Sequence, residues 1–254
     1  MKIQFASDLH LEFIMNKAYI EKYPLQAEGD ILILAGDIIP FNIMHVADNF
    51  FDYVSDNFEM TYWIPGNHEY YQSDINDRSG AFQEQIRDNV ILLNNKSIQI
   101  GNYRIIFSTL WTYIGTQYAN EIKHGMNDFR VIKDDGLSLR PKKYNQLHQD
   151  CVSFIQKELK DCNEDEKLIV ITHHVPTKIN YPFKYKGSIL NEAFAVELED
   201  LIMEFKPDYW IYGHHHAKIK DFSIGETKLM TNQLGYIDLQ EHEGFNRARK
   251  IILK

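Results

Sequence analysis

Residues 64–71 read Ile64-Pro65-Gly66-Asn67-His68-Glu69-Tyr70-Tyr71, directly after an apolar run at 60–64 that predicts a core strand. Gly66 and Asn67 are ordinary turn residues. His68 and Glu69 are not required by a turn, and they place an imidazole and a carboxylate at a strand end. Because sites collect at strand ends in α/β sheets, this stretch is a candidate site, although alone it is more often a structural turn.

Four other predicted strands end in similar groups, which favours a functional explanation. These strands span residues 2–7, 30–35, 167–172 and 208–212. Asp37 follows the strand at 30–35, and seven of the 11 histidines follow the other four strand ends, namely His10, His68, His173, His174, His214, His215 and His216. The carboxyl ends of parallel strands face one edge of a sheet, so we expect these groups to meet.

The order of the predicted elements favours an α/β fold. A helix at 42–58 connects the strands at 30–35 and 60–64, and this βαβ unit predicts a parallel sheet. Gly101-Asn102 joins strands at 97–100 and 103–108 in a tight hairpin, so antiparallel strands are present too. We also expect helices at 80–87, 143–159 and 190–205, short antiparallel strands at 218–224, 227–231 and 248–253, and a long functional loop at 109–141.

Length and composition exclude several classes of protein. The 254 residues fit one α/β domain, expected over 1–254, and the net charge of −9 without a Lys/Arg cluster disfavours long nucleic acid as a partner. No apolar stretch reaches the roughly 20 residues of a membrane span, and residues 1–7 do not resemble a signal peptide. Cys151 and Cys162 bracket a predicted helix and lie too far apart to bridge. We therefore expect a cytoplasmic protein that does not bind membranes, and the sequence carries no signal for its oligomeric state.

The groups at the strand ends suit divalent metals. Asp8 and His10 are two residues apart, so on an extended segment their side chains point the same way. The full candidate set contains nitrogen and oxygen ligands without a thiolate, and it comprises Asp8, His10, Asp37, Asn67, His173, His214 and His216. Such a set fits Mn, Fe, Zn or Co, and it is too large for one ion. Asp37 lies between the two halves of the set and is the expected bridging ligand.

A pair of metal ions about 3.5 to 4 Å apart predicts a reaction class. Bound cations lower the pKa of water by several units, so a hydroxide that bridges two ions is a nucleophile at neutral pH. Two ions also stabilise the attacking and leaving oxygens of a phosphoryl group. The predicted reaction is hydrolysis of a phosphate diester or monoester.

These fragments resemble the calcineurin-like metallophosphoesterases. The matching fragments, in the order of that family, are Asp8-Leu9-His10, Gly36-Asp37, Gly66-Asn67-His68-Glu69, Thr172-His173-His174-Val175-Pro176 and Gly213-His214-His215-His216. The resemblance implies a four-layer αββα sandwich of two mixed sheets flanked by helices. It also implies one metal held by Asp8, His10, Asp37 and His216, and a second held by Asp37, Asn67, His173 and His214. His68 would be catalytic, contacting the phosphate and protonating the leaving oxygen.

One departure from the family separates this chain from its protein-phosphatase branch. That branch continues its Gly-Asp fragment with a further Asp and an Arg, whereas Gly36-Asp37 is followed here by Ile38, Ile39 and Pro40. Activity on phosphorylated proteins is therefore disfavoured, and Glu69 is a candidate to orient His68 in place of the missing Asp.

Several residues have two interpretations at this stage. Asn67, His174 and His215 are candidate substrate contacts, while His174 and His215 could equally form hydrogen bonds behind the ligands. Trp111, Asn127, Asp128 and Arg130 could form a phosphate-binding rim, but Trp111 is more often a core residue. Tyr70 and Tyr71 could flank a leaving group or pack in the core.

The first functional hypothesis is a dinuclear phosphoesterase for a small phosphate ester, including nucleotides. A nuclease of the same family is the second, and it predicts a basic channel. A non-catalytic metal-binding scaffold is the third, and it predicts missing ligands.

Overall fold

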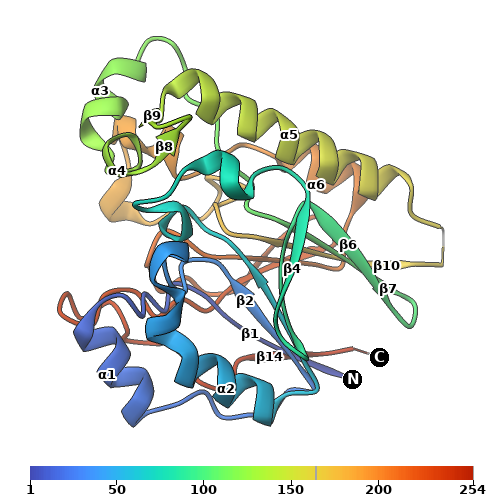
Figure 1. Cartoon of the computed structure of the whole chain (residues 1–254). Coiled ribbons are helices and arrows are strands. Elements are labelled where there is room, and N and C mark those ends of the chain that lie inside the picture. Colours follow the sequence, from blue (N-terminus) through green and yellow to red (C-terminus); the bar gives the residue numbers. More distant parts are fainter. Residues whose placement is uncertain (164, 254) are drawn as a thin grey trace.

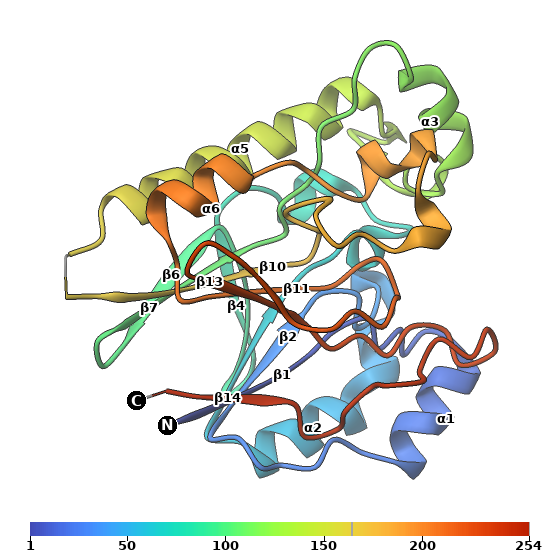
Figure 2. The same ribbon diagram turned by 180° about the vertical axis from the view of Figure 1, so that it is seen from behind.

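The computed structural model describes residues 1–163 and 165–253, which form two six-stranded sheets packed against each other with helices on the outer faces (Figure 1). On one side, α1 (Ile14–Lys22) and α2 (Asp48–Asn57) cover the first sheet. On the other side, α5 (Pro141–Lys160) and α6 (Glu199–Phe205) cover the second sheet, as the reverse view also shows (Figure 2). The expected sandwich of two mixed sheets flanked by helices is confirmed.

The first sheet has the order β14-β1-β2-β3-β5-β4. Its four central strands run parallel, and they are β1 (Lys2–Ala6), β2 (Ile31–Ala35), β3 (Met60–Ile64) and β5 (Val90–Asn94). The two edge strands are antiparallel to their neighbours, and they are β14 (Lys250–Ile252) and β4 (Phe82–Arg87). Lys2 lies opposite Ile252, so the first and last strands of the described chain are paired.

The second sheet has the order β12-β13-β11-β10-β7-β6. Its parallel strands are β13 (Thr227–Thr231), β11 (Tyr209–Tyr212), β10 (Lys167–Thr172) and β7 (Tyr103–Ser108). Its antiparallel edges are β12 (Phe222–Ile224) and β6 (Lys96–Ile100). The parallel pairing of β13 with β11 was not expected, because the sequence predicted only antiparallel strands in this region.

Burial on both faces explains the apolar strands. In β2, Ile31, Ile33 and Ala35 point into the core between the sheets, while Leu32 and Leu34 pack under the helices. Alternate side chains of a strand point to opposite faces, so a strand covered on both sides must be apolar throughout. None of the helices in the described part of the chain is both long and apolar enough to cross a bilayer.

Two predicted helices differ from the structure. Residues 80–87 contain β4 instead of a helix, because pairing with β5 overrides the local preference and leaves an alternately half-buried strand. The predicted helix at 190–205 is divided into η5 (Ile189–Ala193) and α6. Between them the backbone is held by hydrogen bonds from Val196 N to Val175 O and from Leu198 N to Pro176 O.

The remaining elements add detail to the predicted loops. The helix expected at 42–58 consists of η1 (Phe41–Ala47) followed by α2. The stretch 109–141 contains α3 (Ala119–Gly125), α4 (Asp128–Val131), β8 (Lys133–Asp134) and β9 (Leu137–Ser138). Short 3-10 helices lie at η2 (His68–Tyr70), η3 (Ile75–Arg78) and η4 (Phe183–Tyr185). Both cysteines are free, as expected.

Candidate metal centre

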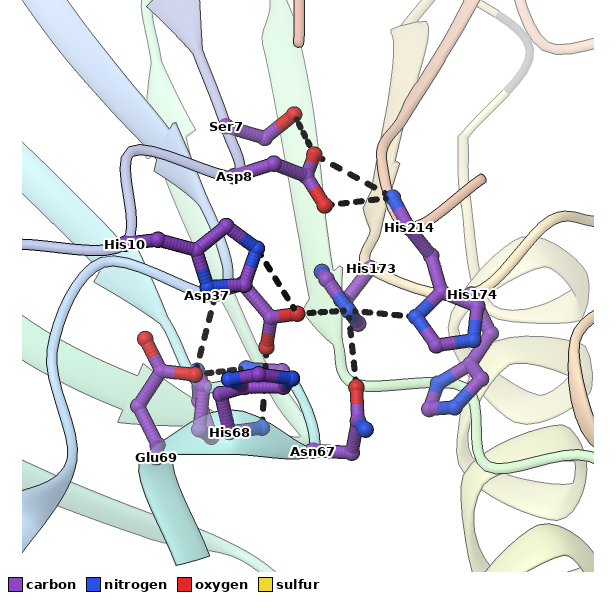
Figure 3. Close-up of polar contacts among 12 residues, drawn as sticks. Ser7, Asp8, His10, Asp37, Asn67, His68, Glu69, His173, His174 and His214 are labelled. Atoms are coloured by element: carbon purple, nitrogen blue, oxygen red, sulfur yellow. Dashed lines mark hydrogen bonds and ion pairs between the residues drawn. The ribbon is translucent and has the colours of Figure 1, made fainter. Parts of the chain in front are cut away.

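Five strand ends meet where the two sheets face each other, and their polar side chains converge on a buried centre (Figure 3). The loops that follow β1, β2, β3, β10 and β11 supply the candidate ligands. The predicted ligands form two groups, each with its atoms within 4.8 Å of one another, namely Asp8, His10, Asp37 and His216, and Asp37, His173 and His214. These side chains are buried, with His216 the most exposed of them. A third group of the same kind lies beside the first and contains His10, Glu12 and His68.

Left-handed backbone, rather than strand alternation, aims the ligands. Asp8 and His10 have φ of 56° and 48°, so the expectation that they lie on an extended segment is wrong. Asp37, His214 and His216 also have positive φ. Residues with side chains rarely adopt this conformation, and it is found where a surrounding structure enforces it at functional sites. The chain therefore coils around the centre after the strands end.

Two glycines allow the loops to approach closely. A Cβ on Gly36 would lie 2.3 Å from His173 Nδ1, and this residue also has φ of +88°. A Cβ on Gly66 would lie 2.2 Å from Asp37 Oδ1. Neither contact is possible between real atoms, so the two glycines in the sequence fragments are required by the packing of the ligands.

In the first group, three side chains surround one point. His10 Nε2 lies 2.9 Å from His216 Nε2, and His216 Nε2 lies 3.2 Å from Asp8 Oδ1. Asp8 is fixed from behind, because it accepts hydrogen bonds from Ser7 Oγ at 2.5 Å and from the backbone N–H of His214 at 3.0 Å. The group has the composition of a site for one cation.

The second group is arranged in the same way. His173 Nε2 lies 3.0 Å from His214 Nδ1 and 3.3 Å from Asn67 Oδ1. Asp37 connects this group to the first, since its Oδ2 lies 3.4 Å from His173 Nε2 and 3.7 Å from His10 Nε2. One carboxylate oxygen is therefore in reach of both halves, as Figure 3 shows.

Hydrogen bonds on the outer sides of three rings direct their Nε2 atoms inward. His10 Nδ1 lies 3.1 Å from Glu12 Oε1, and His216 Nδ1 lies 2.8 Å from Glu241 Oε2. His173 Nδ1 lies 3.0 Å from the carbonyl oxygen of Ala35. Carboxylates and carbonyls only accept, so each Nδ1 carries a proton, and each Nε2 can offer its lone pair to a cation once the ring is neutral. With nitrogen and oxygen donors only, the site fits borderline divalent ions.

Charge in the metal-free protein is balanced among the same groups. Burial acts to raise the pKa of Asp37, but His173 and its neighbours hold it well below the usual range. Burial acts to lower the pKa of His173 and His216, yet Asp37 raises that of His173 to about 9, and Asp8 with Glu241 raises that of His216 to about 10. Buried carboxylates of this kind need a positive partner, which protons supply here and a cation can replace.

His68 lies at the edge of the centre and outside the two groups. Its Nδ1 is 2.9 Å from Glu12 Oε1, its ring stacks on Tyr71 with centroids 4.1 Å apart, and its Nε2 is 3.5 Å from the Tyr236 hydroxyl. Its backbone N–H donates to Asp37 Oδ1 at 2.9 Å. Burial acts to lower the pKa of His68, but Asp37 and Glu12 raise it above its ordinary value.

Glu69 has a different place from the one the sequence suggested. Its carboxylate accepts hydrogen bonds from the backbone N–H groups of Asp37, Ile38 and Gly66, and from Trp63 Nε1. Burial and the neighbouring Asp37 raise the pKa of Glu69 to about 8, and the backbone donors counteract this. Glu69 holds two ligand loops together, and Glu12 is the carboxylate that contacts His68.

A cavity of about 460 Å³ lies over the centre, and its lining shows which of the candidate substrate contacts are accessible from it. His215 lines it, whereas His174 is absent from its described lining and places its Nδ1 3.2 Å from the Thr109 carbonyl oxygen. This placement favours a supporting role for His174. The lining residues, apart from those already described, include Asn127, Arg130, Tyr181, Tyr185, Asn191 and Phe194.

The proposed rim and the tyrosine pair each divide into two parts. Asn127 and Arg130 line the cavity, but Trp111 and Asp128 are buried. Tyr70 is buried in the core, while Tyr71 faces the cavity beside His68.

Comparison with known proteins identifies the family. The family model of calcineurin-like phosphoesterases matches residues 1–218. The chain belongs to this family. As a calcineurin-like phosphoesterase it is a hydrolase that acts on phosphate esters.

Two individual proteins are similar to this chain, one in sequence and one in fold. The phosphoesterase is 32% identical over 274 residues to the uncharacterized protein L509 of Acanthamoeba polyphaga mimivirus, covering 96% of this chain and 94% of that protein. Among solved structures it is similar to phosphopantetheinyl hydrolase from Mycobacterium tuberculosis, with a TM-score of 0.71 and 14% identity over 100% of this chain and 96% of the other. The second match shows a shared fold.

Three residues of the phosphoesterase site were missed by sequence reasoning, and a fourth was given a different place. Glu12 follows His10 by two positions, and this short spacing was the signal available for it. Tyr236 and Glu241 lie far along the chain, in loops without a recognisable pattern. Asp128 was assigned to the rim, but its Oδ1 accepts a hydrogen bond from Asn67 Nδ2.

Proposed function

We propose that this phosphoesterase hydrolyses small phosphate esters at a pair of divalent ions. Asp8, His10, Asp37 and His216 would hold the first ion, and Asp37, Asn67, His173 and His214 would hold the second. Such ions supply an activated water and withdraw charge from the phosphoryl oxygens. The observation that carries the proposal is the position of Asp37 Oδ2, in reach of both His10 Nε2 and His173 Nε2.

His68 is the group that would protonate the leaving oxygen. It faces the cavity beside the two groups of ligands and is not needed to complete either. In the metal-free protein its pKa is raised, which favours the protonated ring, the form that can donate a proton. Tyr71 stacks against one face of the ring and limits its rotation.

The cavity favours a small organic ester as substrate. Its volume of about 460 Å³ lies in the range of sites that enclose a small molecule. Tyr181, Tyr185 and Phe194 give it aromatic walls that suit a flat or apolar leaving group, including a nucleobase. Asn67 and His215 line it and are the proposed phosphate contacts, with Arg130 as a further cation.

A nuclease is not favoured by the structure. Arg130 is the only Lys or Arg among the described residues that line the cavity, whereas binding along a nucleic acid backbone needs several cations. The net charge of −9 acts in the same direction.

The decisive experiment combines metal analysis with a substrate panel. Purified protein would be stripped with a chelator, reloaded with Mn, Fe, Zn or Co, analysed for metal content, and assayed with p-nitrophenyl phosphate, bis-p-nitrophenyl phosphate, nucleotides and single-stranded DNA. We expect about two ions per chain and turnover of small esters that is lost on chelation. Fully loaded protein without turnover of any ester would overturn the proposal, and preference for DNA would replace it with the nuclease.

A further inference from the structure

Glu12 connects two parts of the site that the sequence fragments treat separately. Its Oε1 lies 3.1 Å from His10 Nδ1, on a candidate metal ligand, and 2.9 Å from His68 Nδ1, on the candidate proton donor. The two rings meet edge to face, with centroids 4.4 Å apart. A single oxygen atom therefore accepts from both imidazoles.

The backbone around Glu12 is fixed by the neighbouring loop. The N–H of His10 donates to Asp37 O at 3.0 Å, and the N–H of Leu11 donates to Ile38 O at 2.8 Å. The N–H of Phe13 closes the turn by donating to His10 O at 3.0 Å. This turn brings the Glu12 side chain back over the ring of His10, with 11% of the side chain exposed.

The chemistry of a carboxylate decides what the contacts do. An ionised carboxylate only accepts hydrogen bonds, so the proton of each ring must lie on Nδ1. His10 then presents the lone pair of Nε2 toward Asp37 and His216, as a metal ligand requires. His68 presents Nε2 toward the cavity and the Tyr236 hydroxyl.

The second oxygen of Glu12 shows that both rings depend on one contact point. Glu12 Oε2 is buried and has no hydrogen-bond partner among the described residues. Among the described residues, the hydrogen bonds of the Glu12 carboxylate therefore go through Oε1, to His10 and His68. A shorter carboxylate would not reach both rings from the same backbone position.

We propose that Glu12 is a positioning residue, which sets the ring orientation and tautomer of His10 and His68 together and so couples the first metal position to the placement of the proton donor. The proposal rests on the proposed function for the role of His68. The arrangement of the two rings can nevertheless be tested without any turnover.

The first test observes the rings directly in metal-free protein. Histidine-labelled protein would be examined by ¹⁵N NMR, with His10→Gln and His68→Gln used to assign the two signals. At a pH high enough for both rings to be neutral, we expect the proton on Nδ1 of each ring in the wild type, and a shift toward the Nε2 tautomer in Glu12→Ala. Unchanged tautomers in Glu12→Ala would overturn the proposal, whether or not the protein hydrolyses phosphate esters.

The second test uses a double mutant to separate the effect of Glu12 on His68 from its effect on His10. In metal-loaded protein, Glu12→Ala should lower kcat for phenyl phosphate by about 10- to 100-fold, with KM changed less than threefold. The loss should be smaller for p-nitrophenyl phosphate, because its leaving group needs less protonation. In a His68→Ala background, Glu12→Ala should cause no further loss of kcat, and an additive loss would contradict the proposal.

Metal affinity provides the complementary measurement. Competition titration with Zn²⁺ should show about tenfold weaker binding of one ion in Glu12→Ala, in the wild-type and in the His68→Ala background alike, because that effect passes through His10. Glu21→Ala, on the exposed face of α1, is the matched control and should change neither the Zn²⁺ affinity nor kcat.

A conservative variant guards against a folding defect. In Glu12→Gln the amide oxygen can still accept from both rings, so this variant should retain the wild-type tautomers and a kcat within about tenfold of the wild type. If Glu12→Ala does not fold, Glu12→Asp takes its place, and it should lose one of the two tautomers. Wild-type tautomers together with wild-type kcat in Glu12→Asp would overturn the proposal.

Discussion

Asp128 Oδ1 accepts a hydrogen bond from Asn67 Nδ2 at 3.0 Å. Because a carboxylate cannot donate, the amide nitrogen must face Asp128 and the amide oxygen must face the other way. Asn67 Oδ1 accordingly lies 3.3 Å from His173 Nε2, inside the second group of ligands. Asp128 thereby decides which atom of Asn67 is offered to a cation, and Tyr71 donates a second hydrogen bond to the same carboxylate oxygen.

Asn67→Ala should remove one ion and collapse turnover, because it deletes a proposed ligand. Asp128→Asn should weaken the same ion by about tenfold, since the amide of Asn67 is then free to rotate. Both effects are measured by metal titration beside kcat, with the exposed Asp135→Asn as the matched control. Metal content and activity both unchanged in Asn67→Ala would remove Asn67 from the site.

His68→Ala should separate metal binding from proton donation. We expect about two ions per chain to remain, because neither group of ligands needs this ring, while the rate falls by about 100-fold or more. Elemental analysis and kcat decide the outcome. Loss of metal in this variant would show that His68 is a ligand and that its proposed role is wrong.

Glu69→Gln should destabilise the fold more than it affects metal chemistry. The amide can replace only one of the two carboxylate oxygens as an acceptor. If its nitrogen takes the place of Oε2, the buried backbone N–H groups of Asp37 and Gly66 lose their partner. We expect a loss of about 3 kcal/mol in the free energy of unfolding. Urea denaturation of metal-free protein measures it, with the exposed Glu59→Gln as control; a change below about 1 kcal/mol would contradict this role.

His148 should make the stability of the protein fall with decreasing pH. Burial lowers the pKa of His148, even though its Nδ1 lies 2.7 Å from the Trp111 carbonyl oxygen. A histidine with a lowered folded pKa contributes its full stability above the unfolded pKa and loses it as pH decreases below that value. Urea denaturation of metal-free protein at pH 7 and pH 5.5 should show a smaller difference in His148→Gln than in the wild type.

The exposed His124→Gln is the matched control for this experiment. It should keep the full difference between the two pH values. An equal difference in His148→Gln and the wild type would show that His148 does not sense pH.

The ligand positions were accessible from the sequence because they depend on strand ends. A strand buried on both faces is recognisable from its composition, and parallel strands bring their carboxyl ends to one edge. On this basis Asp37 and His214, which are far apart in sequence, were predicted to lie close together, and the structure places both in one group. Whether they bind metal stays a prediction that the experiments above address.

Other features could not be predicted because they depend on packing between distant loops. Glu12 was not singled out, since its role exists only where the loop after β1 meets the loop after β3. Glu69 was a candidate to orient His68 because the two are adjacent in sequence. Both of its carboxylate oxygens instead accept hydrogen bonds from four N–H donors. The strand at Phe82–Arg87 was predicted as a helix because local propensity does not include the effect of pairing with β5.

The pairing of β1 with β14 has a consequence for how the enzyme matures. Asp8 follows β1, and β1 gains its outer neighbour only when residues 250–252 have been synthesised. His216 also emerges late in translation. The early half of the chain can condense on its own but lacks the late histidines of the centre, so metal loading should wait until the loop that carries His216 has been synthesised.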